Sequence, residues 1–147
     1  MKVLVDTSIW SLALRRSGAL AEEDRSLVDE FHELIDDVRV AMIGPLRQEL
    51  LSGIPSQAQF EALKEKLQAF EDLPLGCDDY ERAAGFYDTC RRRGFQGPPT
   101  DLLVCAVGAG MGMPIFTSDK DFALYAKHLP VSLHRPAGAP QPERRFT

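Results

Sequence analysis

The chain has 147 residues, of which 44% are hydrophobic and 27% are charged, and this predicts one globular domain that buries a core without disulfides or a structural metal. The same composition excludes disordered, collagen-like and coiled-coil proteins. The formal net charge of −5 argues against a partner held by a broadly basic surface, but if five of the 22 acidic residues surround a cation, the remaining 17 balance the 17 Lys and Arg. The charge therefore does not exclude a nucleic-acid partner.

The apolar stretches and the cysteines indicate the cellular compartment. Uncharged apolar runs fall well short of the ~20 residues that span a bilayer, and only three apolar residues separate Lys2 from Asp6, too few for a secretory leader. Cys77, Cys90 and Cys105 include no C-x-x-C pair, which favours reduced core thiols over disulfides or a zinc site. We expect a cytoplasmic protein with no membrane partner.

Predicted strands and helices alternate along the first half of the chain. The Val-rich segment 2–6 predicts a buried strand that ends in a carboxylate, and Thr7-Ser8 offers an N-cap for a helix. The elements expected next are a helix over 22–37, a strand over 40–43, a short helix from Pro45 to Gly53 that carries Glu49, a helix over 60–70 and a weaker strand over 73–75.

The second half of the chain continues the alternation. We expect a helix over 78–93, a buried helix that starts at Thr100 and ends at Gly112, a strand over 114–117, a helix that Ser118-Asp119 caps and that runs to Lys127, and a strand over 131–133. Strands that alternate with helices predict an α/β fold, a three-layer α/β/α sandwich with a mainly parallel central sheet. Residues 1–134 should form this domain, and 135–147 a mobile Pro-rich tail.

Acidic residues recur where the predicted strands end. Asp6 ends the first strand, Asp119 and Asp121 follow the strand over 114–117, and Asp101 and Glu49 lie on helices near the same edge. Taken singly, each has a structural explanation as a helix cap, a first-turn acid or a solvated helix face. Together at one sheet edge they would repel one another unless a cation lay between them.

Three segments resemble PIN-domain ribonucleases, and most of all the VapC toxins of toxin–antitoxin systems: MKVLVDTSIW at the start, RQELLSG around Glu49, and PPTDLLVCAVGAGMGMPIFTSDKDF from Pro98 to Phe122. The resemblance extends from Met1 to about Leu133. It implies catalytic and metal-binding roles for Asp6, Glu49, Asp101 and Asp119, with Asp121 as a further acid near the metal. It also implies that the hydroxyls of Thr7, Thr117 and Ser118 support these acids.

The resemblance implies a metal-dependent endoribonuclease toxin that cleaves RNA phosphodiester bonds through metal-activated water. Carboxylate ligands favour Mg²⁺ or Mn²⁺ over softer ions. The expected partners are an RNA substrate, a cognate antitoxin that places an Arg or Lys against the acids, and a second copy of the chain in a homodimer.

Other interpretations stay open at this point. A phosphoryl-transfer domain of the haloacid-dehalogenase type needs a second Asp two residues after the first, where this chain has Ser8. A non-catalytic PIN-like module that binds RNA or another partner is the main alternative. The run Arg91-Arg92-Arg93 is compatible with phosphate contacts or with an ordinary helix terminus, and Trp10 with core packing or nucleotide stacking.

Overall fold

Three short parallel strands form the centre of the computed structural model, which describes residues 1–14 and 20–136. β1 (Val3–Val5) lies between β2 (Val40–Ala41) and β3 (Ile115–Phe116), in the order β2-β1-β3. Leu4 is paired with Ala41 on one side and with Ile115 on the other. The first strand of the chain is therefore the central strand of the sheet.

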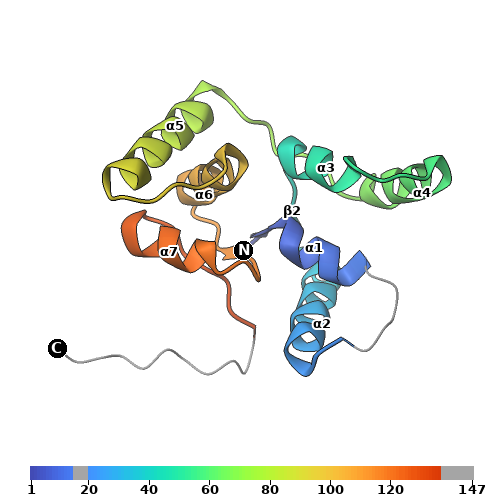
Figure 1. The fold of residues 1–147 in the computed structure, drawn as a ribbon. Helices are drawn as coiled ribbons and strands as arrows, with labels where there is room; N and C mark the ends of the chain where they lie inside the picture. The colour runs from blue at the N-terminus through green and yellow to red at the C-terminus, as the bar shows by residue number, and fades with distance from the viewer. Residues whose placement is uncertain (15–19, 137–147) are drawn as a thin grey trace.

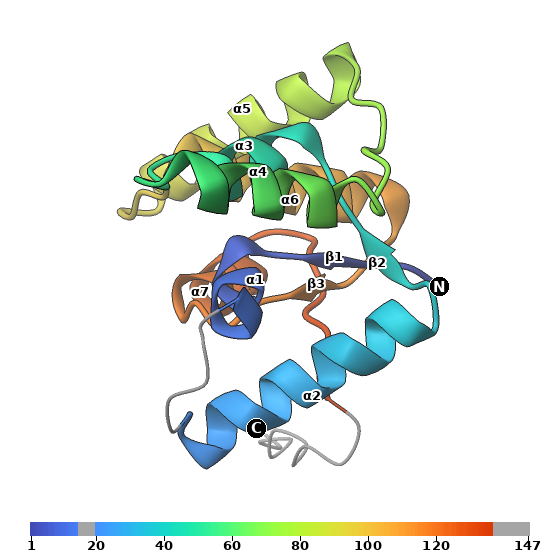
Figure 2. The same cartoon turned by 90° about the vertical axis from the view of Figure 1, so that its right-hand side faces the viewer.

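Helices cover both faces of this sheet. Figure 2 shows α3 (Gly44–Leu51), α4 (Gln57–Leu67), α5 (Cys77–Arg92) and α6 (Pro99–Met111) on one side, with α1 (Thr7–Leu14), α2 (Glu22–Asp36) and α7 (Asp121–His128) on the other. Val3, Leu4 and Val5 are fully buried, as expected for a strand that is covered on both faces. The predicted three-layer α/β/α sandwich with a parallel sheet is confirmed.

The helix after the first strand begins earlier than predicted, because the residues expected to cap it belong to the helix itself. Thr7 and Ser8 lie inside α1, and the capping position falls to Asp6, whose side chain accepts a hydrogen bond from the Ser8 N–H at 3.4 Å. Trp10 is 4% exposed and makes edge-on contacts with Phe31 of α2 and with Phe70. Core packing is thus the role that the structure gives Trp10.

Arg47 fixes the helix that carries Glu49. Its guanidinium donates to the carbonyl of Leu67 at 2.9 Å, to the carbonyl of Phe70, and to Asp72 Oδ1 at 2.8 Å. These partners lie at the end of α4 and in the segment after it (Figure 1). One guanidinium therefore binds three acceptors and fixes α3 against the segment 67–72, about twenty residues later in the chain.

The helix α6 is the buried centre of its layer. Every residue from Leu102 to Gly108 is buried, in agreement with the apolar sequence. Pro98 occupies the capping position and Pro99 begins the helix, so the predicted start at Thr100 is late by one residue. Gly112 ends it with a φ of 64°, the left-handed conformation that favours glycine at this position.

Several predicted features are shorter than expected or absent. The strands predicted over 73–75 and 131–133 are single parallel bridges, Met42 to Asp72 and Ile115 to Leu133. Pro74 has no N–H to donate, and the Val131 N–H bonds locally to Leu129, so neither segment extends a ladder. Cys90 and Cys105 are buried thiols, but Cys77 is exposed at the start of α5, which corrects the expectation of three core thiols.

None of the helices in the described ranges has the length and apolar character needed to cross a membrane. The predicted boundary at residue 134 stays a prediction, and most of the predicted tail, residues 137–147, lies outside the described residues.

Candidate active site

Asp6 lies at the carboxyl end of the central strand and is the anchor of the site. It is 5% exposed, and its backbone N–H donates to the Phe116 carbonyl at 2.9 Å. Its Oδ2 accepts hydrogen bonds from the Thr117 hydroxyl at 2.9 Å and from the Ser8 N–H at 3.4 Å. A buried polar group needs hydrogen-bond partners, and these bonds hold the side chain of Asp6 in one place.

Two hydroxyls connect Asp6 to the segment after β3. Thr117 gives its one hydrogen to Asp6, so Ser8 is the donor in the 3.2 Å contact between the two hydroxyl oxygens. Thr117 Oγ1 also accepts from the Asp119 N–H at 3.0 Å, and Ser8 Oγ accepts from the Ser118 N–H at 2.9 Å. Ser118 joins this network through its backbone N–H and not through the hydroxyl that the family resemblance implied.

Asp119 lies in the turn between β3 and α7, and Asp121 is the first residue of α7. The Asp121 N–H donates to Asp119 Oδ1 at 2.9 Å, but the capping position is Lys120, one residue after the predicted cap. Both carboxylates are exposed. The bond from Asp121 uses one oxygen of Asp119 and leaves the other available.

Asp101 enters the site from the first turn of α6. Its Oδ2 accepts a hydrogen bond from the Tyr125 hydroxyl at 3.0 Å, and Tyr125, on α7, is 1% exposed. A Cβ at Gly97 would collide with this hydroxyl and with the Leu102 side chain, so only glycine lets the loop before α6 pass so close. The loop, α6 and α7 thus fix the position of Asp101 together.

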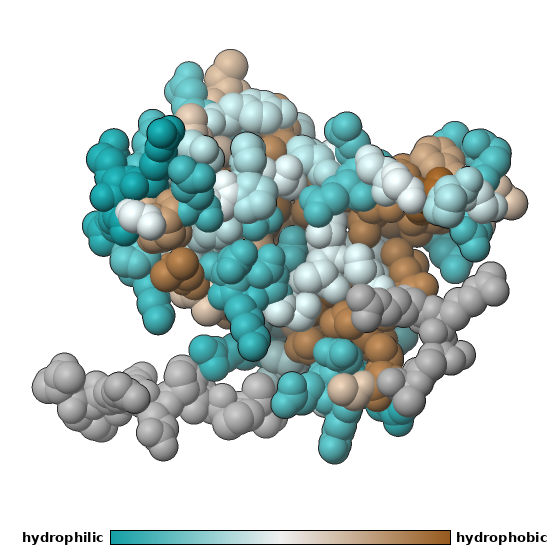
Figure 3. Space-filling view, in the orientation of Figure 1, coloured by the Kyte–Doolittle hydropathy of each residue, from teal (hydrophilic) through white to brown (hydrophobic). Residues whose placement is uncertain are grey.

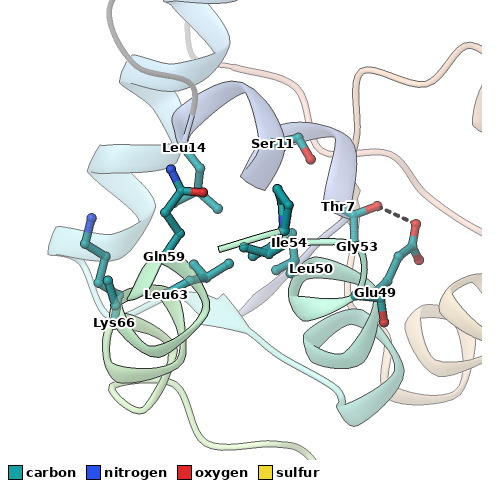
Figure 4. A pocket seen from close by; sticks show the side chains of 13 residues that line it. Thr7, Ser11, Leu14, Glu49, Leu50, Gly53, Ile54, Gln59, Leu63 and Lys66 are labelled. Atoms are coloured by element: carbon teal, nitrogen blue, oxygen red, sulfur yellow. Dashed lines mark hydrogen bonds between the residues drawn. The ribbon is translucent and has the colours of Figure 1, made fainter. Parts of the chain in front are cut away.

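Glu49 reaches the site from α3. Its Oε1 accepts a hydrogen bond from the Thr7 hydroxyl at 3.1 Å (Figure 4). Thr7 is the residue after Asp6, so this bond brings α3 to the carboxyl end of β1. Glu49 is exposed, unlike Asp6, and its position depends on this contact and on the packing of α3.

The electrostatic effects on Asp101 show which acids lie together. The pKa of Asp101 is raised from 3.8 to about 6, mainly by burial; the Tyr125 hydrogen bond opposes the rise, and the charges of Asp6, Asp119 and Glu49 add to it. The charge of Asp121 acts instead on Tyr125, whose pKa is raised mainly by burial. Behind the site, burial and then the Asp101 charge raise the pKa of the Cys105 thiol to about 12.

We call Asp6, Glu49, Asp101 and Asp119 the acid site. In residues 1–14 and 20–136, no three acidic, His or Cys side chains already stand close enough around one point to hold a metal ion. Like charges repel, and each of the four carboxylates is drawn toward a hydrogen-bond donor of its own. The donor set nevertheless fits a hard cation, because it consists of carboxylate oxygens and because a cation would relieve the repulsion that acts on Asp101.

A groove of about 680 Å³ opens beside the acid site, between α1, α3 and α4. Thr7 and Glu49 lie at one end, and Figure 4 shows Gln59 and Lys66 at the other. Its walls combine apolar side chains with hydroxyl, amide and ammonium groups. The lining includes Leu14, Leu50, Ile54, Leu63, Ser11, Gln59 and Lys66. A chain that lies in this groove therefore reaches Glu49.

Sequence reasoning missed Tyr125 and the position of Ser8 in the hydroxyl network. Tyr125 could have been noticed, because it lies on the apolar face of the helix that follows Asp119. A tyrosine hydroxyl that is buried needs a hydrogen-bond partner, and the acids are the nearest candidates in the sequence. Ser8 lies two residues after Asp6, but its link to Thr117 joins positions 109 residues apart, and no local pattern reveals that contact.

The comparisons with known proteins agree with this geometry. A family model described as the PIN domain matches residues 3–128. FitAcB from Neisseria gonorrhoeae has a TM-score of 0.71 at 19% identity, over 91% of this chain and 97% of that chain. VapBC-5 from Mycobacterium tuberculosis, a member of the VapBC family of toxin–antitoxin systems, has a TM-score of 0.64 at 24% identity, over 91% of this chain and 98% of that chain.

A third similar structure is VapBC2 from Rickettsia felis, bound to a DNA fragment from its promoter. Its TM-score is 0.72 at 14% identity, over 91% of this chain and 98% of that chain. No curated protein matches the chain. At these identities the three structures establish a common fold, and the chemistry has to be argued from the site.

Proposed function

The chain belongs to the PIN domain family, and from this membership we propose that it is a metal-dependent endoribonuclease, the toxin of a toxin–antitoxin pair. One observation carries the proposal. Asp6, Asp119 and Glu49, from three separate elements, all act on the carboxyl group of Asp101 and raise its pKa. Local hydrogen bonds explain the acids one at a time, but they do not explain why four carboxylates lie close together, because mutual repulsion costs stability.

Mg²⁺ or Mn²⁺ is the proposed cofactor, held by the acid site with Asp121 nearby. When bound, the ion activates water and neutralises charge on the phosphate that is cleaved. The residues of the chain supply the positioning. Thr117 and Ser8 hold Asp6, Tyr125 orients Asp101, and Thr7 restrains Glu49.

RNA is the proposed substrate, an antitoxin the proposed inhibitor, and a second copy of the chain the proposed partner in a homodimer. VapBC-5, which shares the fold, is described as a toxin–antitoxin protein. We propose that an Arg or Lys of the antitoxin pairs with Asp6 or Asp101, since a guanidinium binds two carboxylate oxygens at once. The groove that ends at Glu49 offers apolar contacts to the rest of such a segment.

Cleavage of bulk RNA by the purified chain tests the catalytic proposal. We expect cleavage in Mg²⁺ or Mn²⁺, none in EDTA, and a rate drop of at least ~10³ in Asp6→Asn, Asp101→Asn and Asp119→Asn, because each removes a ligand of the ion. Glu49→Gln should behave similarly. Asp29→Asn, an exposed carboxylate on α2, is the matched control and should leave the rate unchanged.

Rates within tenfold of the unmodified chain in all three Asp variants would overturn the assignment. If the folded chain binds RNA without cutting it in either metal, the non-catalytic PIN-like module is the correct interpretation.

The antitoxin proposal has a separate test. We expect a gene next to this one to encode a short protein that co-purifies with the chain and suppresses cleavage. A structure of that complex should place an Arg or Lys of the partner against Asp6 or Asp101. A partner that binds only on the opposite face, with no segment near the acids, contradicts this mode of inhibition.

A further inference from the structure

The carboxyl ends of α5 and α7 form a basic surface in an otherwise acidic protein. Arg91, Arg92 and Arg93 end α5, and Lys127 lies in the last turn of α7. All four side chains are exposed, and we call them the basic edge. In Figure 3 the most hydrophilic colours gather at the left of the molecule, where α5 ends in Figure 1.

A direct contact holds the two helix ends together. Arg93 Nη1 donates to His128 Nδ1 at 3.1 Å, because a guanidinium has donors and no acceptor. The His128 ring also lies 5.0 Å from the ring of Phe95, in the loop after α5. The basic edge is therefore one surface built from two helices that are far apart in sequence.

The same contacts lead from the basic edge to the acid site. Phe95 stacks on Tyr125 with their ring centroids 6.4 Å apart, and the Tyr125 hydroxyl donates to Asp101. The segment from Gly94 to Pro98 joins Arg93 to the helix that carries Asp101. One aromatic layer thus separates the cations from a carboxylate of the acid site.

These cations have no acidic partners among the described residues. Within residues 1–14 and 20–136, ion pairs join Arg47 to Asp72, Lys64 to Glu61, Arg82 to Asp79 and His134 to Glu30, and none includes a residue of the basic edge. Asp88 lies one turn earlier on α5 without such a pair. The helix dipoles of α5 and α7 favour cations at their carboxyl ends. They do not explain why the two carboxyl ends bring four cations together against their mutual repulsion.

We propose that the basic edge binds the phosphate backbone of the RNA strand whose scissile bond lies at the acid site. This inference rests on the proposed function, because it takes RNA as the substrate. A strand that crosses the carboxylate rim is repelled there unless cations hold its flank, and exposed arginines bind phosphate oxygens two at a time. The basic edge supplies that attraction beside the acids.

Equilibrium binding of a fluorescent 15-nucleotide single-stranded RNA, measured in EDTA at several salt concentrations, tests the proposal without any cleavage. Changing Arg91, Arg92 and Arg93 together to Gln should weaken binding about 100-fold at 0.1 M salt and reduce the slope of log K against log salt by about 2, because three phosphate contacts are lost at ~0.7 each. Changing the same residues to Lys should keep most of the slope.

The control neutralises three exposed cations elsewhere, Lys2, Arg25 and Lys64, so that the net charge changes equally. This control should lower affinity much less and leave the slope nearly unchanged. Equal losses in the two triple variants, or an unchanged slope in the Arg triple, would overturn the proposal and leave the basic edge to a protein partner. If the unmodified chain binds RNA through the basic edge but does not cleave it in Mg²⁺ or Mn²⁺, the proposed catalytic function is refuted and this binding proposal is not.

Discussion

At the level of single residues, the Thr117 hydroxyl joins parts of the chain that are distant in sequence. It donates to Asp6, accepts from the Asp119 N–H and contacts the Ser8 hydroxyl. Asp6 is buried, so a donor lost here is not replaced by bulk water.

Thr117→Val is therefore expected to lower the free energy of unfolding by ~1–3 kcal/mol, because it leaves a buried carboxylate short of one donor while keeping the shape of the side chain. Thr117→Ser retains the hydroxyl and should cost clearly less. Urea unfolding followed by circular dichroism measures both. A Thr117→Val chain as stable as the unmodified chain, or a Ser variant that loses more stability than the Val variant, would contradict the role given to the hydroxyl.

Asp101 makes the metal-free protein sensitive to pH. Its pKa is about 6 in the folded chain, against an ordinary value of 3.8, so the folded state binds this proton more tightly than the unfolded state does. Its contribution to stability is complete below about pH 4 and is lost as the pH rises through about 6. In EDTA, Asp101→Asn should raise the melting temperature relative to the unmodified chain more at pH 7.5 than at pH 4.5.

Thermal melts of Asp29→Asn, from the exposed face of α2, provide the matched control for this prediction. A metal-free Asp101→Asn protein that is less stable at pH 7.5 by more than ~1 kcal/mol would show that the carboxylate serves mainly as the acceptor for Tyr125.

The sequence and its family resemblance predicted the acidic residues and two of the hydroxyls that hold them, Thr7 and Thr117, but not Ser8 or Tyr125. Asp6 and Asp119 follow short apolar strands, so their common edge follows from the parallel order. The links from Ser8 to Thr117 and from Tyr125 to Asp101 depend on how α1 and α7 pack, and a tyrosine on an apolar helix face does not by itself show which group it contacts. Asp121 was predicted near the metal, but its charge acts on Tyr125 rather than on Asp101.

At the level of elements, Arg47 determines where α3 presents Glu49. Replacing it by Met removes the bonds to Asp72 and to two carbonyls and should lower the free energy of unfolding by ~1–3 kcal/mol. RNA cleavage should fall as well, because α3 loses its fixed position. Lys64→Met removes an exposed ion pair at 3.9 Å and should cost less than ~0.5 kcal/mol. A fully active Arg47→Met chain would contradict this role.

The elements themselves were largely predictable because their periodicities are strong. The apolar segment of α6 and the spaced apolar residues of α2 gave both helices to within a residue or two. The errors lie at helix ends and in edge strands, and the largest is in α4, which was expected over 60–70 and spans Gln57–Leu67. The position of a helix cap depends on which backbone N–H groups remain without a partner. The length of an edge strand depends on how many backbone groups of its neighbour are free to bond. Both are properties of the folded protein and not of a short segment.

At the level of the whole molecule, the net charge of −5 includes the opposite charges of an acid site and a basic edge, which Phe95 and Tyr125 connect. If the acid site binds a divalent ion only in the folded state, the ion stabilises the fold by ~2.7 kcal/mol at a hundred times its dissociation constant. The melting temperature at pH 7.5 should then rise by roughly 5–10 °C in millimolar Mn²⁺ compared with EDTA at equal ionic strength. Asp6→Asn should lose most of this rise, and an undiminished rise would place the ion elsewhere.

The central position of β1 also affects how the protein is made. Asp6 leaves the ribosome before its hydroxyl donor, Thr117, which lies 111 residues later, a separation that corresponds to about 6–22 s of translation at ordinary elongation rates. During that time the nascent chain carries neither β3 nor Asp119, and its first strand has no neighbour on one side. The acid site therefore cannot assemble before Thr117 and Asp119 have been synthesised, and under the proposed function the chain could not cut RNA before that point.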